Sequence, residues 1–122
     1  MRSKRKTIAV IFGTRPDTIK LAPIILALKK ERALFRVVTI ATAQHRQMLD
    51  QVLKVFRIRP DHDLDIMKPR QTLAEITRNT ITGLDRVLAD ERPDMVLVQG
   101  DTTTTFVGSL AAFYRRIPVG HV

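Results

Sequence analysis

Two short segments of the sequence combine a glycine with charged and hydroxyl side chains, which suits phosphate binding and proton transfer. In segment 13–20 (GTRPDTIK), the glycine permits a tight turn and the helix that follows offers free N–H groups to an anion. Arg15 and Lys20 add positive charge there. We predict a pyrophosphate-binding loop. The alternative is that both cations are surface charges that neutralise Asp17 and Glu31.

The second segment, 100–105 (GDTTTT), places Asp101 between a glycine and four threonines. A carboxylate in this position can hold a sugar hydroxyl or move a proton. It can also simply cap the helix that follows, a position that Asp and Thr favour. Both interpretations are open on the sequence alone.

Three further side chains are weaker candidates. His45 starts a helical stretch and Arg70 lies in a loop ahead of another helix, so each is either a ligand contact or an ordinary surface group. For His121, on an apolar strand, a core or backbone-bonded histidine is the commoner arrangement. The sequence lacks cysteine, zinc-type spacing of His and Glu, a P-loop and a dinucleotide fingerprint, so we expect neither a metal nor a cofactor.

Alternating apolar runs and amphipathic stretches form the frame that must position these segments. Strands are predicted at 7–12, 35–41, 95–98 and 117–122, with a short edge strand at 63–67. Helices are predicted at 16–30, 44–56, 72–91 and 103–114. Strands that are apolar throughout predict a parallel sheet with helices on both faces, an α/β, Rossmann-like fold. Ligands of such sheets bind beyond the carboxyl ends of the strands, where the candidate segments fall.

The composition fits one folded domain: 122 residues, 44% hydrophobic and 27% charged. A net charge of +9 attracts anions. Part of it comes from basic residues at the start of the chain, which form either a solvated tail or a nucleic-acid arm: Arg2, Lys4, Arg5 and Lys6. Aromatic residues do not alternate with basic ones, so we expect no nucleic-acid partner. Without an apolar run of membrane-spanning length or a cysteine, the sequence favours the cytoplasm and no membrane.

Four strings of residues occur in order over nearly the whole chain. They are 12–23 (FGTRPDTIKLAP), 42–50 (TAQHRQMLD), 99–105 (QGDTTTT) and 116–122 (RIPVGHV). Together they resemble the non-hydrolysing UDP-N-acetylglucosamine 2-epimerases of bacteria. One position departs from that family, because Asp17 stands where the family has glutamate.

The resemblance implies an isomerase of polysaccharide biosynthesis that needs no cofactor. It would interconvert UDP-GlcNAc and UDP-ManNAc by removing the C2 proton, eliminating UDP and adding it back. The fold implied is the first domain of a two-domain, glycosyltransferase-B-like enzyme. Residues 1–122 would then be an incomplete N-terminal domain that lacks the C-terminal domain and is inactive alone. A nucleotide-sugar glycosyltransferase and a non-enzymatic phosphate- or nucleic-acid-binding module are the alternatives.

The resemblance also implies roles for individual residues. Arg15 and Lys20 would stabilise the diphosphate, and Asp101 would be an acid/base or sugar-orienting carboxylate. Further substrate contacts are implied at Gly13, Thr14, Asp17 and Thr102. A second UDP-GlcNAc would bind as an allosteric activator at Gln44, His45, Gln47, Arg70 and Gln71. The intact enzyme is expected to be a homodimer.

Overall fold

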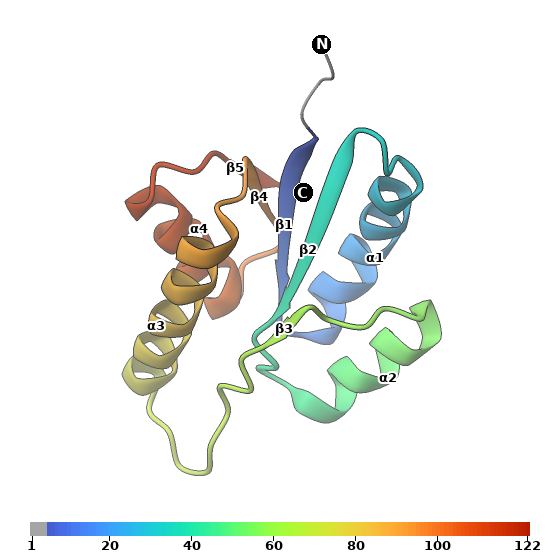
Figure 1. The fold of residues 1–122 in the computed structure, drawn as a ribbon. Helices are drawn as coiled ribbons and strands as arrows, with labels where there is room; N and C mark the ends of the chain where they lie inside the picture. Colours follow the sequence, from blue (N-terminus) through green and yellow to red (C-terminus); the bar gives the residue numbers. More distant parts are fainter. Residues whose placement is uncertain (1–4) are drawn as a thin grey trace.

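A parallel sheet with helices on both faces forms the frame of the computed structural model, which describes residues 5–122 (Figure 1). The strands are β1 (Lys6–Phe12), β2 (Phe35–Ala41), β3 (His62–Asp63), β4 (Met95–Val98) and β5 (Val119–His121). The helices are α1 (Arg15–Lys30), α2 (Arg46–Phe56), α3 (Leu73–Glu91) and α4 (Thr103–Tyr114). The strand order β3-β2-β1-β4-β5, with all neighbours parallel, confirms the predicted α/β, Rossmann-like fold. Of the basic residues at the start of the chain, Arg2 and Lys4 lie outside the described residues.

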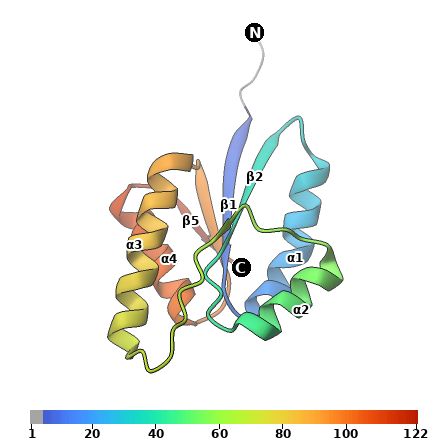
Figure 2. The same ribbon diagram turned by 60° about the horizontal axis from the view of Figure 1, so that its bottom comes forward.

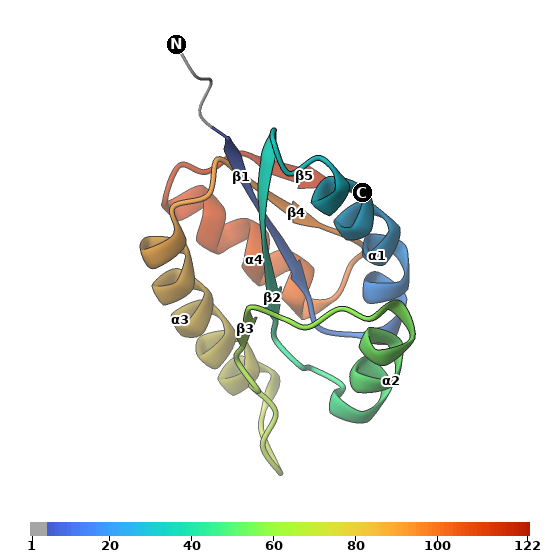
Figure 3. The ribbon, with the colours of Figure 1, turned by 45° about the vertical axis from the view of Figure 1, so that its right-hand side comes forward.

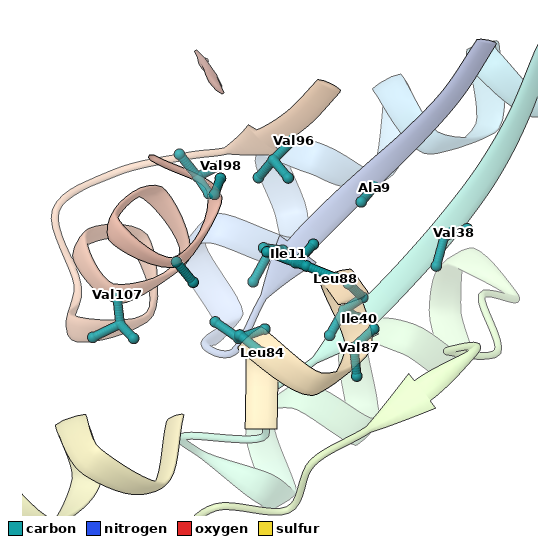
Figure 4. Packing of buried hydrophobic residues seen from close by; sticks show 12 residues of the cluster. Ala9, Ile11, Val38, Ile40, Leu84, Val87, Leu88, Val96, Val98 and Val107 are labelled. Atoms are coloured by element: carbon teal, nitrogen blue, oxygen red, sulfur yellow. The ribbon is translucent and has the colours of Figure 1, made fainter. Parts of the chain in front are cut away.

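The central strand β1 is apolar and buried on both sides from Ile8 to Phe12. Ala9 and Ile11 belong to a core cluster under α3 and α4, whose members are shown in Figure 4. Val10 and Phe12 point to the other face and pack with residues of α1 and α2. The two helical layers are separated by the sheet in Figures 2 and 3. Burial on both faces is the physical reason for the continuous apolar run.

The strand order reverses at β1, and in doubly wound sheets a ligand crevice lies at such a reversal. From β1 the chain passes through α1 to β2 on one side, and from β3 it returns through α3 to β4 on the other side of β1. The loops after β1 and β4 therefore leave the sheet at the point where the strand order reverses. Ligands of doubly wound sheets bind at such a point. Below, this end of the sheet is called the carboxyl edge.

The edge strand differs from the prediction of 63–67. Only His62–Asp63 pairs regularly with β2. The extended run ends at Asp65, whose backbone is left-handed with φ of 46°. The Leu64 N–H still donates to the Ala41 carbonyl at 2.8 Å, so the segment stays attached to the sheet.

Other helices and strands start at positions that differ from the predictions for local backbone reasons. Helix α2 begins at Arg46 and not at position 44, because the two preceding residues form a turn and His45 takes the N-cap. Strand β5 begins after Pro118, which has no N–H to donate to a ladder. Helix α3 starts as predicted, since the Thr72 hydroxyl caps it by accepting from the Glu75 N–H. No helix within residues 5–122 combines the length and apolar character that a membrane crossing requires.

Candidate functional site

The loops that follow β1, β2 and β4 are packed tightly together at the carboxyl edge. A Cβ atom added to Gly13 would lie 2.0 Å from the Thr42 Oγ1 atom and 2.7 Å from the Thr104 Oγ1 atom. Only glycine fits at this position without displacing its neighbours. Gly13 is therefore required by the close approach of two other segments, beyond the tight turn that the sequence indicated.

A chain of buried hydrogen bonds lies beneath this glycine. The Thr104 hydroxyl donates to the Gln44 Oε1 atom at 3.0 Å and lies 2.9 Å from the Thr42 hydroxyl. Since the single proton of Thr104 is used toward Gln44, the Thr42 hydroxyl donates to Thr104. These bonds join the end of β2 to the start of α4 at the carboxyl edge.

Asp17 is buried and shapes the loop from below. Its side chain is 2% exposed and accepts hydrogen bonds from the N–H groups of Gly13 at 3.2 Å and Thr14 at 3.0 Å. The Thr18 hydroxyl donates to the same carboxylate at 3.2 Å. Burial raises the pKa of Asp17 above its ordinary value, although these hydrogen bonds oppose the rise. Two N–H groups of the loop ahead of α1 are thus already bonded, and Asp17 acts here on the loop backbone.

Arg15 and Lys20 stay free of ion pairs. Both are exposed, and neither forms an ion pair with a carboxylate within the described residues, Asp17 and Glu31 included. The interpretation as charges that neutralise those two acids is therefore wrong. Arg15 also borders a mostly apolar hollow of about 350 Å³ between α1 and α2, lined by Ile19, Gln51, Val52, Val55 and Phe56. These cations remain available to an anionic ligand.

Asp101 projects from the loop between β4 and α4 as an exposed side chain. It does not cap α4, because that role belongs to Thr102, whose hydroxyl accepts from the Thr105 N–H at 3.3 Å. The capping interpretation of Asp101 is therefore wrong. Within residues 5–122 no hydrogen bond engages its carboxylate.

His121 lies at the end of β5, beside the same loop. Its Nε2 atom is 2.7 Å from the Gly100 carbonyl oxygen. Of the interpretations that the sequence left open, a bond to the backbone is confirmed, whereas burial in the core is wrong because the side chain is exposed.

The residues predicted for an activator lie in two segments at the same end of the molecule (Figure 2). They are Gln44, His45 and Gln47 around the start of α2, and Arg70 and Gln71 in the loop before α3. Gln44 is half-buried and holds the Thr104 hydroxyl, while the Gln71 Oε1 atom accepts from the Lys68 N–H at 3.0 Å. The other three side chains are exposed.

Sequence reasoning missed the part played by Arg46. Its guanidinium binds both carboxylate oxygens of Asp63 at 2.9 and 2.6 Å and also contacts Asp50 and Asp65 at 3.1 Å each. The hydrogen bonds that Arg46 donates to Asp63 are the main reason that the pKa of Arg46 is raised above its ordinary value. The i, i+4 spacing of Arg46 and Asp50 was visible in the sequence, but the contact with the β3 segment needs the fold.

One larger hollow lies away from the predicted site residues, and the described residues include no metal-binding cluster. This hollow, of about 550 Å³, lies between the end of α3 and the start of β5, at the opposite edge of the sheet, and includes no predicted site residue. The part of the chain that the structure describes holds no group of three or more His, Asp or Glu side chains arranged to bind a metal ion.

The strand order and the helices on both faces define a Rossmann-like α/β domain. MurG of Acinetobacter baumannii, 20% identical, superposes with a TM-score of 0.73 over 95% of this chain and 34% of its own, which shows the fold alone. The family model for UDP-N-acetylglucosamine 2-epimerase matches residues 27–122. The chain belongs to this family, as the four strings of residues predicted.

Individual relatives agree with this assignment. The UDP-N-acetylglucosamine 2-epimerase of Bacillus subtilis is 61% identical over 119 residues, which make up 98% of this chain and 31% of that protein. The crystal structure of UDP-GlcNAc 2-epimerase from Neisseria meningitidis bound to UDP-GlcNAc is 58% identical and superposes with a TM-score of 0.90, over 95% of this chain and 31% of that one. The chain thus spans about a third of the length of the relatives that it matches.

Proposed function

We propose that residues 1–122 are the incomplete N-terminal domain of an enzyme that interconverts UDP-GlcNAc and UDP-ManNAc. The observation that carries the proposal is a set of exposed charges without an ion pair within residues 5–122, in a chain of this family: the cations Arg15 and Lys20 of α1 and the carboxylate of Asp101 after β4. The complete enzyme would add a C-terminal domain that closes the crevice. Its cytoplasmic location stays a prediction.

The reaction needs a base near C2 of the sugar and positive charge near the departing diphosphate. As the C2–H bond breaks, its electron pair forms the C1–C2 double bond, and the electrons of the C1–O bond leave with the β-phosphate of UDP. The product is a 2-acetamidoglucal, to which UDP and a proton return with inversion at C2. Arg15 and Lys20 would stabilise the negative charge on UDP. Such fixed donors often contribute the largest catalytic effect, about 10²–10³ in rate for each donor.

Asp101 suits the role of acid/base or sugar-orienting carboxylate because no hydrogen bond or ion pair within residues 5–122 engages its side chain. A carboxylate used as a helix cap would be held by backbone N–H groups, but Thr102 does that work here. Gly13, Thr14, Asp17 and Thr102 would form the rest of the substrate site, with Asp17 acting through the loop backbone. The Thr14 side chain is buried beside the Asp17 carboxylate, so it belongs to the same loop structure.

The proposal includes a second UDP-GlcNAc as an activator and a homodimer as the working enzyme. His45, Gln47 and Arg70 support the activator site, since they are exposed polar groups at the same edge as the substrate crevice. Gln44 would link the two sites, because its side chain accepts the hydrogen bond from Thr104 beneath Gly13.

The activity is tested by incubating the complete enzyme with UDP-GlcNAc in D₂O without any sugar acceptor. We expect UDP-ManNAc to form and deuterium to enter C2 of both sugars. If UDP-GlcNAc stays unchanged without an acceptor but is consumed in a second reaction that contains one, the enzyme is a glycosyltransferase and the proposal is wrong.

The role of Asp101 is tested with Asp101→Asn, which we expect to lower kcat by at least about 10²-fold. Asp90→Asn is the matched control, because Asp90 is an exposed aspartate on α3 without an ion pair in the described structure. Equal rates for the two variants would remove Asp101 from the mechanism.

A further inference from the structure

The turn that presents Asp101 is held from two sides. The Gln99 carbonyl accepts from the Thr105 hydroxyl at 2.7 Å, a bond within the same strand–helix unit. The next carbonyl, that of Gly100, accepts from the His121 ring at 2.7 Å. His121 belongs to β5 and is the contact that reaches this turn from another strand.

The backbone at this turn needs such support. Gly100 has φ of 88°, a left-handed conformation, and a Cβ atom added to it would meet nothing within 4 Å. Glycine is therefore favoured here because of its positive φ angle. A Cβ atom would not clash with any neighbour. Glycine is also the residue with the greatest backbone freedom. A short bond to its carbonyl restricts the peptide that leads directly into Asp101.

The position of His121 is itself fixed by the sheet. Its backbone lies opposite Val98, the last residue of β4, and the N–H of the following Val122 donates to the Val98 carbonyl at 2.9 Å. The imidazole is thus anchored at the level where β4 ends. From there its Nε2 atom reaches the Gly100 carbonyl oxygen.

We infer that His121 is a positioning residue, which holds the Gly100 carbonyl and thereby aims the Asp101 carboxylate into the crevice. The inference rests on the proposed role of Asp101. A carbonyl oxygen only accepts, so the His121 Nε2 atom must carry the proton. The neutral Nε2–H tautomer and the charged ring both meet this requirement, and the bond therefore does not depend on the charge of His121. An error of about 1 Å in placing a reacting group costs on the order of 10²-fold in rate, which sets the scale of the expected effect.

A matched pair of variants in the complete enzyme tests the inference. The side-chain amide of glutamine can place its N–H where Nε2 lies, whereas that of asparagine reaches only as far as Nδ1. We expect His121→Asn to lower kcat by about 10- to 100-fold with KM changed less than about threefold. We expect His121→Gln to restore kcat to within about threefold of the wild type.

Two kinetic outcomes would overturn the inference. A wild-type kcat for His121→Asn would show that the turn needs no such support. An equal loss in both variants would show that the imidazole itself is required, or that the residue only completes β5. Thermal unfolding of both variants separates these results from a general loss of structure.

A measurement on the unmodified enzyme keeps the inference testable if His121→Asn does not fold. A ¹⁵N-resolved NMR spectrum of the His121 ring should show a protonated Nε2 that is hydrogen-bonded to a carbonyl, and an unprotonated Nε2 would contradict the inference. Asp101→Asn separates this inference from the proposed function. If that variant is active, the role of Asp101 fails; if it is inactive while His121→Asn is fully active, only the inference about His121 fails.

Discussion

Helices α1 and α2 start with the same type of residue, but the two residues differ in whether they form ion pairs. Each helix begins with an arginine, Arg15 in α1 and Arg46 in α2. A cation in the first turn of a helix is unfavourable, because the helix dipole places partial positive charge there. Arg46 is compensated by three carboxylates, with its closest contact to Asp63 at 2.6 Å. Arg15 has no carboxylate partner among the described residues.

The difference separates an arginine held by ion pairs from one that has no carboxylate partner within residues 5–122. The charges of Arg46, Asp63 and Asp65 tie the start of α2 to the segment around β3. At the start of α1 the nearby carboxylate, Asp17, is turned under the loop to hold two N–H groups, which leaves Arg15 exposed. An anion bound at this loop would supply the compensation that the protein supplies at α2.

The largest expected effect comes from removing the unpaired arginine. Arg15→Ala should lower kcat/KM of the complete enzyme by at least about 10²-fold, because the charge on the departing diphosphate loses a fixed cation. Its melting temperature should stay close to that of the wild type, since no ion pair is lost. Arg78→Ala, at an exposed arginine of α3, is the control for loss of charge alone. Steady-state kinetics that are alike for the two variants would remove the distinction between Arg15 and an ordinary surface arginine.

The next effect concerns the glycine on which the α1 loop depends. Gly13→Ala should destabilise the chain by about 1–3 kcal/mol, because the new methyl group would overlap the Thr42 and Thr104 hydroxyls. Urea unfolding measures this loss. Thr42→Ala removes the nearer oxygen, so the double variant should lose less than the sum of the two single variants. Strict additivity would mean that the two residues do not meet.

A smaller effect is expected from the paired arginine. Arg46→Ala should lower the free energy of unfolding by about 1 kcal/mol, at the upper end for exposed ion pairs because one of its pairs is bidentate. Added salt should reduce the difference by screening. Urea titrations at low and high salt provide the test. If the variant is as stable as the wild type at low salt, Arg46 has no more structural role than Arg15.

The smallest effect is a pH dependence that comes from Asp17. Its pKa is raised in the folded chain, so the folded state binds the proton more tightly than the unfolded state. The contribution of Asp17 to stability is then full below its ordinary pKa of 3.8 and is lost as the pH rises through the folded value. The stability of the wild type relative to Asp17→Asn should therefore fall as the pH rises from about 4. Unfolding curves in a pH series test this, and a difference that grows with pH would contradict it.

The sequence predicted most of the fold because its signals were local. The apolar run of β1 and the Thr72 cap of α3 each depend on neighbours in the chain. The edge strand was misplaced because the left-handed backbone of Asp65 has no reliable sequence signal, and Asp can adopt it where tertiary contacts require it.

The candidate site was predicted in part, and its misses share one cause. Arg15 and Asp101 were identified from loops and helix starts. Whether a charge is paired or free depends on segments that are distant in sequence, so the ion pair between Arg46 and Asp63 needed the structure. For the same reason, the sequence could not show that the buried Thr42–Thr104 pair makes Gly13 essential.

The central claim is that the loop after β1 binds a sugar nucleotide's diphosphate. A crystal structure of the complete enzyme with UDP tests it most directly. We expect the two phosphates at the start of α1, within hydrogen-bond distance of the Arg15 guanidinium. Phosphates bound elsewhere, with Arg15 still facing solvent, would contradict the account.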